Sequence, residues 1–552
     1  MDLCRFFQTF TPAQQPTNLR EFVAPSVTPP VYSAGSRKHT IADAVLGTGR
    51  YHTHQRQRVC SAKATSTQRS SPFSTLLDWG QQGATKLSRG LQPFPAGFPA
   101  GPSGDQALQL LADPLGYLDR ITQQYGPVVG LVLGGEYVVV VADVAAARTV
   151  LQDQTGLFVK EGTAFLPGSS LAGNGLLVSD GPVWRRQRQL SNPAFRTAAV
   201  QAYAKAMAAS AQRLVSETWQ GSRERDVYAD FNALSLQITM EALFGVDLPP
   251  REGRQVTEAV KAAFDYFSQR GASSMVVPEW VPTPVNVQFN AAIITLNRLV
   301  YGMISQRRMQ LRQQPHPPVC LLEELITATD ERGQGMEDEA LRDELMTLLI
   351  AGQETAAIAL TWTCAYLAHN PAAQDSIAAE VQQHLHGQPP SYSNIRGLVG
   401  VESALLEGMR LKPPAFIVGR CVSRPTELAS CRLPAGTTIL VSPYILHRLP
   451  GRWRDAAAFQ PDRWHHQLQE SSGAMGLLPK LAATGAYLPF GAGPRSCIGT
   501  GFAMMEASII LAAILQRYQL KPSRVQPSFP TADPQITLRP QEIVTLSVES
   551  RP

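Results

Sequence analysis

The chain has 552 residues, of which 44% are hydrophobic and 17% are charged, a balance that excludes a disordered chain and predicts a large core. The formal net charge is +5, but much of it lies near the N-terminus and no nucleic-acid motif accompanies it, so nucleic-acid binding is not expected. The seven cysteines form no CxxC pair, which excludes a disulfide framework and a zinc site and favours a reducing compartment.

Residues 1–75 differ in composition from the rest of the chain. They hold nine Lys or Arg residues against three acidic ones, and Ser and Thr are frequent. This composition predicts an organelle transit peptide, for a plastid first and a mitochondrion second, with a plain disordered tail as the alternative. A run of about 20 apolar residues is missing there, so a signal anchor is not expected. Residues 76–104 are rich in Pro and Gly and are predicted to be a linker.

Residues 105–552 are predicted to form one folded domain. Residues 107–125 have helical spacing, and the β-branched residues 128–141 predict two strands joined by a turn at Gly134-Gly135. Helical patterns dominate to about residue 415, and short strands follow, as at 437–441. Since strands and helices do not alternate regularly, the predicted fold class is mostly α with a minor β component (α+β).

Residues 345–368 are the most apolar stretch and are long enough to cross a bilayer. However, Gln353, Glu354 and Thr355 lie at the centre of the stretch, where a carboxylate would be costly in a membrane. The stretch is therefore predicted to be a buried core helix. An acid beside an alcohol in such a helix indicates a function, because leaving them buried without partners costs free energy. A helix kink with satisfied polar groups is the alternative.

A glycine-rich loop precedes Cys497. Gly491, Gly493 and Pro494 predict a tight, irregular loop, and the pattern of 499–518 predicts a helix directly after it. The positive end of this helix and its free N–H groups are expected to favour the Cys497 thiolate over the thiol. The cysteine is therefore a candidate metal ligand or nucleophile, with an inert buried cysteine as the alternative.

Residues 490–499 match the pattern F-x-x-G-x-R-x-C-x-G at every fixed position, and the chain resembles the cytochrome P450 family, whose haem-binding signature this is. The resemblance implies a helix-rich catalytic domain over 105–552, with small sheets around a buried haem b. It implies that Cys497 binds the iron and that Arg495 pairs with a haem propionate. The other residues that the signature assigns to haem contact are Phe490, Gly491, Gly493 and Gly499.

Two further motifs resemble the same family. Glu407 and Arg410 form an E-x-x-R pair, and the segment 459–464 would add Arg463 to it as a structural network. Alone, the pair could be an exposed salt bridge of under about 1 kcal/mol. The sequence A-G-Q-E-T at 351–355 resembles the oxygen-activation segment. Gly352 would leave room for O2, and Glu354 and Thr355 would deliver protons as catalytic residues.

Further haem contacts are implied by weaker resemblances. Trp184 and Arg188 form a W-x-x-x-R pattern that would face the propionates, and Arg420 matches another propionate-binding position. His447 is a further candidate for propionate contact, although a lone histidine is more often structural.

The resemblance implies a monooxygenase that inserts one atom of O2 into an apolar substrate. Residues 349–355 and 360–363 are similar to plastid carotenoid ring hydroxylases, with related bacterial enzymes also similar, so hydroxylation of a carotenoid ring is the first hypothesis. A fatty acid or terpenoid hydroxylase, a peroxide isomerase or dehydratase, and a haem sensor are the alternatives. Substrate contacts are expected near residues 160–175, 265–290 and 415–420.

The reaction also needs electrons from outside the haem domain. Because no flavin or nicotinamide motif is present, the expected donor is a separate ferredoxin, with NADPH as the source of electrons. We expect a monomer, with peripheral membrane contact as a possibility that the sequence leaves open.

Overall fold

The computed structural model describes residues 92–551, apart from 163–169, 222, 272–278 and 280. The predicted transit peptide over 1–75 and residues 76–91 of the predicted linker lie outside the described residues. The remaining part of that segment contacts the main sheet: Gly130 donates its N–H to the carbonyl oxygen of Ala100 at 3.0 Å, and Phe98 is buried.

The described chain is mostly helical, as predicted. The helices are α3 (Ala107–Ala112), α4 (Pro114–Tyr125), α5 (Val144–Leu151), α6 (Gly181–Ser191), α7 (Thr197–Arg213), α8 (Val227–Ile238), α9 (Pro250–Gly271), α10 (Pro284–Gln313), α11 (Leu321–Thr327), α12 (Asp338–His369), α13 (Pro371–Leu385), α14 (Val399–Leu411), α15 (Pro443–Leu446), α16 (His465–Glu470), α17 (Ala474–Thr484) and α18 (Thr500–Arg517).

The strands form small sheets. They are β1 (Val128–Leu133), β2 (Glu136–Val141), β3 (Phe158–Val159), β4 (Glu224–Asp226), β5 (Val418–Val422), β6 (Thr426–Leu428), β7 (Cys431–Leu433), β8 (Thr438–Val441), β9 (Tyr518–Pro522), β10 (Ala532–Pro534), β11 (Leu538–Pro540) and β12 (Thr545–Ser550). The largest sheet has the order β1-β2-β8-β5-β3, with a parallel pairing between β2 and β8. A second sheet has the order β4-β12-β9, and β6-β7 and β10-β11 are two-stranded.

Two local predictions can be compared directly with the structure. The strand pair over 128–141 is confirmed: Gly134 and Gly135 both have positive φ, as a two-residue hairpin turn requires. The helix predicted over 107–125 is interrupted, because Asp113 caps a new helix that begins at Pro114. A proline disfavours helical dihedrals at the residue before it, here Asp113, which explains the break.

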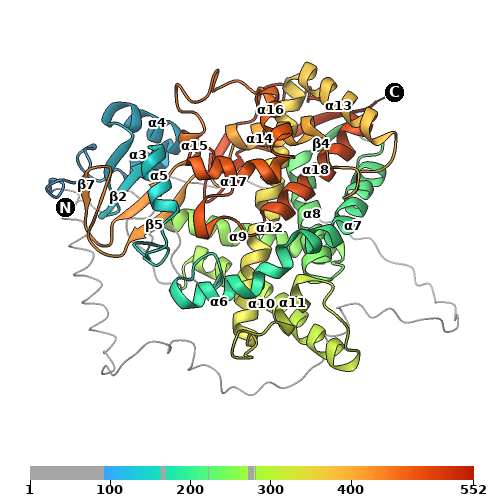
Figure 1. Ribbon diagram of the computed structural model, residues 1–552, viewed down its shortest axis with the longest axis horizontal. Coiled ribbons are helices and arrows are strands. Elements are labelled where there is room, and N and C mark those ends of the chain that lie inside the picture. Colours follow the sequence, from blue (N-terminus) through green and yellow to red (C-terminus); the bar gives the residue numbers. More distant parts are fainter. Residues whose placement is uncertain (1–91, 163–169, 222, 272–278, 280, 552) are drawn as a thin grey trace, which may run out of the picture. The chain divides into compact units, whose positions relative to one another are not determined.

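Helix α12 is the central core helix. In Figure 1 it runs through the helical part of the molecule, while the main sheet lies beside α3, α4 and α5. It packs against α8, α10, α14, α18 and β9. Among the described helices it alone is long and apolar enough to cross a membrane, but 83% of its most apolar stretch is buried within the protein. The prediction of a buried core helix is therefore confirmed, and a helix that is apolar all round needs this burial.

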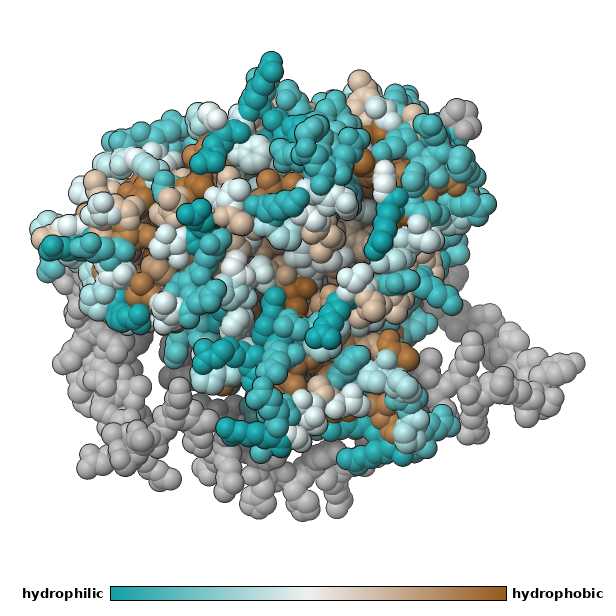
Figure 2. Space-filling model, viewed as in Figure 1, coloured by the Kyte–Doolittle hydropathy of each residue, from teal (hydrophilic) through white to brown (hydrophobic). Residues whose placement is uncertain are grey.

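The surface of the molecule is mixed. Figure 2 shows a face covered mainly by polar residues, with smaller apolar areas between them. The core lies underneath, and its largest cluster joins α7, α8, α12, α14 and α18. Of these helices, α12 carries Glu354 and Thr355, and α18 begins directly after the Cys497 loop.

Candidate functional site

The loop before α18 presents Cys497. Its backbone N–H donates to the carbonyl oxygen of Phe490 at 2.9 Å and closes the loop. Gly491 and Gly493 both have a φ of +69°, and a Cβ on Gly493 would lie 2.3 Å from the carbonyl oxygen of Leu151. Only glycine fits there without strain. Cys497 is accessible to solvent although it lies deep among the surrounding elements, so the loop offers the sulfur to a partner outside the polypeptide.

The backbone at the helix N-terminus favours the Cys497 thiolate, as predicted, but this effect does not outweigh burial. Burial raises the pKa of the Cys497 thiol above its usual value, and the Gly499 N–H, Arg188 and Thr500 lower it only in part. The cause is desolvation, which disfavours the charged form. A bound metal deprotonates a coordinating thiol outright, so the sulfur becomes a thiolate when it binds a metal ion.

Basic side chains from four parts of the chain meet near this loop. Arg188 of α6 donates to the carbonyl oxygen of Ser496 at 3.0 Å, and Arg495 lies over the Trp184 ring, 4.3 Å from its centroid. Burial lowers the pKa of Arg420 on β5 to about 10, and the nearby charge of Arg495 lowers it further. Each of these positive charges therefore lowers the pKa of its neighbour. An anion bound among them would relieve this repulsion, so the group is suited to binding anions.

Lys160, which the sequence did not single out, completes this cation cluster, which comprises Lys160, Arg188, Arg420 and Arg495; Asp180 is a second residue that the sequence did not single out. Burial lowers the pKa of Lys160 to about 7, the charges of Arg420 and Arg495 add to this effect, and Asp180 opposes it. Asp180 forms an ion pair with Arg495 and accepts the backbone N–H groups of Lys160 and Glu161, each at 2.7 Å. The sequence could have pointed to Asp180, because this residue directly precedes Gly181-Pro182 and Trp184 at the start of α6.

The residues fit a haem b group. Its two propionates are the kind of anion that the cation cluster would bind. A Cβ on Gly499 would meet only ordinary contacts, 3.8 Å from the Cys497 sulfur and 3.9 Å from Phe195, so the polypeptide does not itself require glycine. Ala351 is exposed and Thr355 is partly exposed in the middle of the buried helix α12. These positions leave space beside α12 for a group that is not polypeptide.

Glu354 and Thr355 point to different partners. The Thr355 hydroxyl donates to the carbonyl oxygen of Ala351 at 2.7 Å, a bond that a threonine in a helix can make to the preceding turn. The Glu354 carboxylate accepts from Tyr228 of α8 at 3.1 Å and from Thr537 at 3.0 Å. Among the described contacts the two side chains are not bonded to each other. Glu354 is buried, and burial raises the pKa of its carboxyl.

Gly352 lies two residues before Glu354 in α12, at a close approach to Thr239. A Cβ at this position would be 3.3 Å from the hydroxyl oxygen of Thr239, so a larger residue would press on that side chain. Thr239 is buried, and its hydroxyl has no partner in the described part of the chain.

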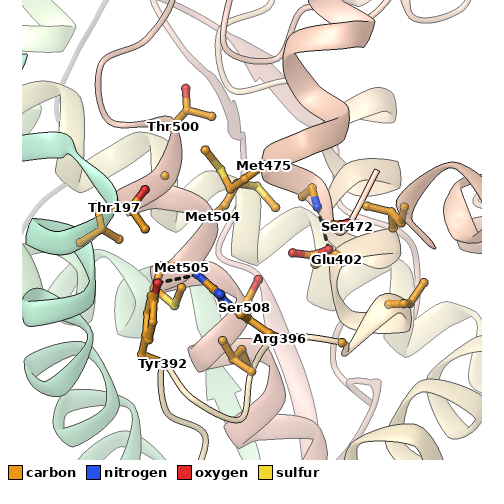
Figure 3. A pocket seen from close by; sticks show the side chains of 18 of the residues that line it. Thr197, Tyr392, Arg396, Glu402, Ser472, Met475, Thr500, Met504, Met505 and Ser508 are labelled. Atoms are coloured by element: carbon orange, nitrogen blue, oxygen red, sulfur yellow. Dashed lines mark hydrogen bonds between the residues drawn. The ribbon is translucent and has the colours of Figure 1, made fainter. Parts of the chain in front are cut away.

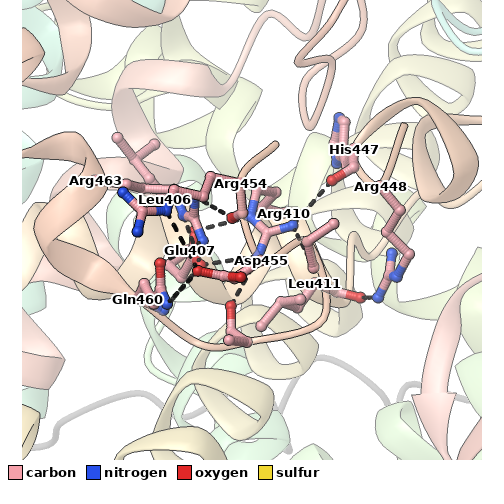
Figure 4. Close-up of polar contacts among 12 residues, drawn as sticks. Leu406, Glu407, Arg410, Leu411, His447, Arg448, Arg454, Asp455, Gln460 and Arg463 are labelled. Atoms are coloured by element: carbon pink, nitrogen blue, oxygen red, sulfur yellow. Dashed lines mark hydrogen bonds and ion pairs between the residues drawn. The ribbon is translucent and has the colours of Figure 1, made fainter. Parts of the chain in front are cut away.

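Figure 4 shows the network around Glu407 and Arg410. These two side chains are fully buried and paired at 2.9 Å, and Arg463 donates to Glu407 at 3.0 Å. Arg410 also donates to the carbonyl oxygens of His447, Ala456 and Ala458. The indole N–H of Trp464 donates to Glu407 at 2.9 Å, a bond that a phenylalanine at this position could not make. Glu407 and Arg410 therefore form a buried ion pair whose polar groups have further hydrogen-bond partners, and not an exposed salt bridge.

His447 belongs to this network and not to the cation cluster, so the expectation of propionate contact is wrong. Its Nε2 accepts the backbone N–H of Leu488 at 2.7 Å, and its ring lies 4.8 Å from that of Tyr487. Burial lowers its pKa to about 3, and Arg448 and Arg410 add to this effect. The ring is therefore neutral at physiological pH, with its proton on Nδ1.

We expect Glu407→Ala to lower the free energy of unfolding by about 3–5 kcal/mol, because it leaves the Arg410 cation buried without its partner. Chemical unfolding of the haem-loaded protein, followed by circular dichroism, measures the change. Glu549→Ala is the control: it removes a half-exposed ion pair with Lys521 and should cost at most about 1 kcal/mol. Equal small losses in both variants would contradict the buried network.

A cleft reaches the Cys497 loop from the surface. Figure 3 shows Met475, Met504 and Met505 in its wall, with Tyr392 and Arg396 at one side. Glu402 accepts the backbone N–H of Ala474 at 2.8 Å beneath it. None of the cleft's lining residues belongs to α12. The cleft therefore approaches Cys497 from the side of α14, α17 and α18.

Comparison with known proteins gives a consistent result. The family model described as Cytochrome P450 matches residues 95–546. Cyclooctatin synthase of Streptomyces melanosporofaciens is 33% identical over 425 residues, which cover 76% of this chain and 88% of that protein. Cytochrome P450 97B2, chloroplastic, of Glycine max is 28% identical, with 72% of this chain and 76% of that protein covered.

A solved structure agrees with these sequence relationships. The crystal structure of CYP175A1 from Thermus thermophillus superimposes with a TM-score of 0.62 and 28% identity, and covers 80% of this chain and 96% of that one. This agreement confirms the predicted fold of helices and small sheets. The chain therefore belongs to the cytochrome P450 family and is a haem b monooxygenase that uses O2, an apolar substrate and an external source of electrons.

Proposed function

We propose that the protein hydroxylates a ring carbon of an unsaturated isoprenoid, with a carotenoid as the first candidate substrate. The observation that carries this proposal is the helix α12, whose residues 349–355 and 360–363 are similar to plastid carotenoid ring hydroxylases. The similarity to cytochrome P450 97B2, chloroplastic, of Glycine max supports a plastid enzyme of the same family. Part of the expected substrate-contact region, at 163–169, 272–278 and 280, lies outside the described residues.

The haem would be held by residues of this chain in two groups. Cys497 would bind the iron through its sulfur, with Phe490 and the glycines Gly491, Gly493 and Gly499 shaping the surface around it. The cation cluster would bind the propionates, and Trp184 would position Arg495 by stacking. Asp180 must then share Arg495 with a propionate. When bound, haem with a thiolate ligand supplies the oxygen chemistry, because the thiolate favours O–O cleavage.

Protons would come from α12. Insertion of one oxygen atom into a C–H bond of the substrate consumes O2, two electrons and two protons, and releases water. The Thr355 hydroxyl, which is partly exposed, would hold a proton on its oxygen atom and pass it into the space where O2 reacts. The buried Glu354 carboxyl would resupply it, through water or by rotation, since the two side chains have separate hydrogen bonds. Gly352 would leave space for O2.

The electron donor is proposed to be a ferredoxin supplied from NADPH. The cleft that reaches Cys497 offers a route from the surface to the metal ligand. We also propose a plastid location, for which the basic N-terminal composition and the similarity to a protein named chloroplastic are the support. A monomer that touches membranes only peripherally is the simplest arrangement for an apolar substrate.

A smaller terpenoid is the second candidate substrate. The similarity to cyclooctatin synthase favours it, because that protein has the higher identity and 88% of its length is covered. A fatty acid remains the third.

The test is a reconstituted reaction. Haem-loaded protein, a plant ferredoxin, its reductase and NADPH are incubated separately with β-carotene, a cyclic diterpene hydrocarbon and a long-chain fatty acid. We expect a ring-hydroxylated carotenoid by mass spectrometry, together with a substrate-induced shift of the haem spectrum. A product from the diterpene alone would support the second candidate, and a product from the fatty acid alone would contradict both.

A further inference from the structure

Glu354 lies at the end of a chain of charged groups that reaches the surface. Its carboxylate is 4.0 Å from Nη1 of Arg539, on β11. Arg539 pairs in turn with Asp265 of α9 at 2.8 Å. Lys261 pairs with the outer oxygen of Asp265 at 2.7 Å. The exposed fraction of the side chains rises along this order, from 8% at Glu354 through 13% and 31% to 68% at Lys261.

Arg539 is held in place from several sides. Its Nε is 3.3 Å from Asp533 on β10, the neighbouring strand of the hairpin. The hairpin is fixed to α12 by Trp362, whose indole N–H donates to the carbonyl oxygen of Leu538 at 2.8 Å. An arginine stays charged at any working pH. Arg539 is therefore a fixed positive charge at a set position beside Glu354.

The two members of the Arg539–Asp265 pair act on Glu354 in opposite directions. Burial raises the pKa of the Glu354 carboxyl, the positive charge of Arg539 lowers it, and the negative charge of Asp265 raises it. Hydrogen bonds from Thr537 and Tyr228 also lower it. Burial raises the pKa of Tyr228 itself, so this hydroxyl stays neutral. Arg539 and Asp265 are thus the charged groups that face Glu354 from β11 and α9, with Asp533 reached through Arg539.

We propose that Arg539 is a positioning residue for the monooxygenase reaction: held by Asp265, it sets how readily Glu354 releases the proton that oxygen activation needs. This inference rests on the proposed role of Glu354 as the proton reserve. It assigns a function to a residue of the C-terminal hairpin that lies 185 positions beyond Glu354 in the sequence and outside the family motifs.

The expected signs follow from the charges. A proton donor works only below its own pKa, so the alkaline limb of the coupling profile, measured as product formed per NADPH, follows the pKa of Glu354. Arg539→Met removes the cation, so Glu354 keeps its proton longer and the limb moves to higher pH. Asp265→Asn removes the anion, so the limb moves to lower pH. A charge within about 4–6 Å shifts a pKa by about one unit or more, which sets the scale of the Arg539 effect.

The experiment measures product per NADPH against pH for the haem-loaded wild type and for both variants, with melting temperature and the reduced CO spectrum as checks of folding. Arg539→Lys keeps the charge and should return the midpoint toward the wild type. The matched controls are Arg551→Met and Asp375→Asn, a similar Arg–Asp pair that does not act on Glu354. Neither control should move the midpoint.

Shifts of opposite sign for Arg539→Met and Asp265→Asn would support the proposal. A lower melting temperature in both variants, with the midpoint unchanged, would overturn it and leave Arg539 with a purely structural role. Glu354→Gln separates this result from failure of the proposed function. If Glu354→Gln itself leaves coupling unchanged, the proton-reserve role is wrong. If it uncouples the reaction while the Arg539 and Asp265 variants do not shift the midpoint, only the present inference fails.

Discussion

Replacing Cys497 by alanine is expected to abolish the red-shifted Soret band of the reduced CO complex and to remove most of the bound haem. The loop closed by the Cys497–Phe490 hydrogen bond presents one sulfur atom. Without the sulfur the protein has lost its bond to the iron. In the wild type this bond stabilises the thiolate, which burial alone would disfavour. The absorption spectrum of the purified variant and its haem content per polypeptide measure the effect.

Cys431→Ala is the matched control for this prediction. Cys431 is a free cysteine of intermediate exposure on β7, so its removal should leave both the CO band and the haem content unchanged. A normal thiolate spectrum in Cys497→Ala would show that another group binds the iron. Loss of the band in both variants would point to general unfolding instead, and circular dichroism would detect it.

Thr355→Ala is expected to uncouple the reaction while haem binding and the CO spectrum stay normal. The hydroxyl lies on a partly exposed stretch of α12 and bonds the carbonyl of Ala351. If it passes protons to bound oxygen, NADPH is still consumed but hydrogen peroxide replaces the hydroxylated product. General acid–base groups contribute about 10²–10⁴-fold, so product per NADPH should fall by at least about tenfold even if water partly substitutes.

Thr361→Ala is the control for Thr355→Ala. Thr361 makes the same kind of bond, from its hydroxyl to the carbonyl of Ala357 at 2.7 Å, but it is fully buried in the same helix. Its loss should lower the melting temperature and leave coupling intact. Measuring product, peroxide and melting temperature on both variants decides between the roles. Intact coupling with reduced stability in Thr355→Ala would mean that the hydroxyl only shapes the helix.

Local sequence determined the elements whose conformation depends on near neighbours. The glycines before Cys497 have the positive φ that their pattern predicts, and α18 begins three residues after the cysteine. The apolar stretch around 345–368 forms one helix, most of which is buried. Glu407 and Arg410 meet because residues three apart share a helix face. The family could therefore be recognised from motifs alone.

Only the tertiary structure decided the electrostatics of the site, because these depend on residues that are distant in the sequence and on burial. The thiol of Cys497 has a raised pKa in spite of its place before a helix, since desolvation outweighs the helix end. Lys160 and Asp180 join Arg420 and Arg495 across more than 200 residues. Composition and spacing carry no information on such distances.

The dependence on distant residues also explains which properties of α12 the sequence determined and which it could not determine. Glu354 and Thr355 were recognisable as an acid–alcohol pair, but the sequence could not show that their side chains have separate partners. The bonds of Glu354 to α8 and to the C-terminal hairpin arise only when the chain folds. A motif specifies which chemical groups are present, whereas the packing of distant elements sets the charge and the hydrogen bonds that each group meets.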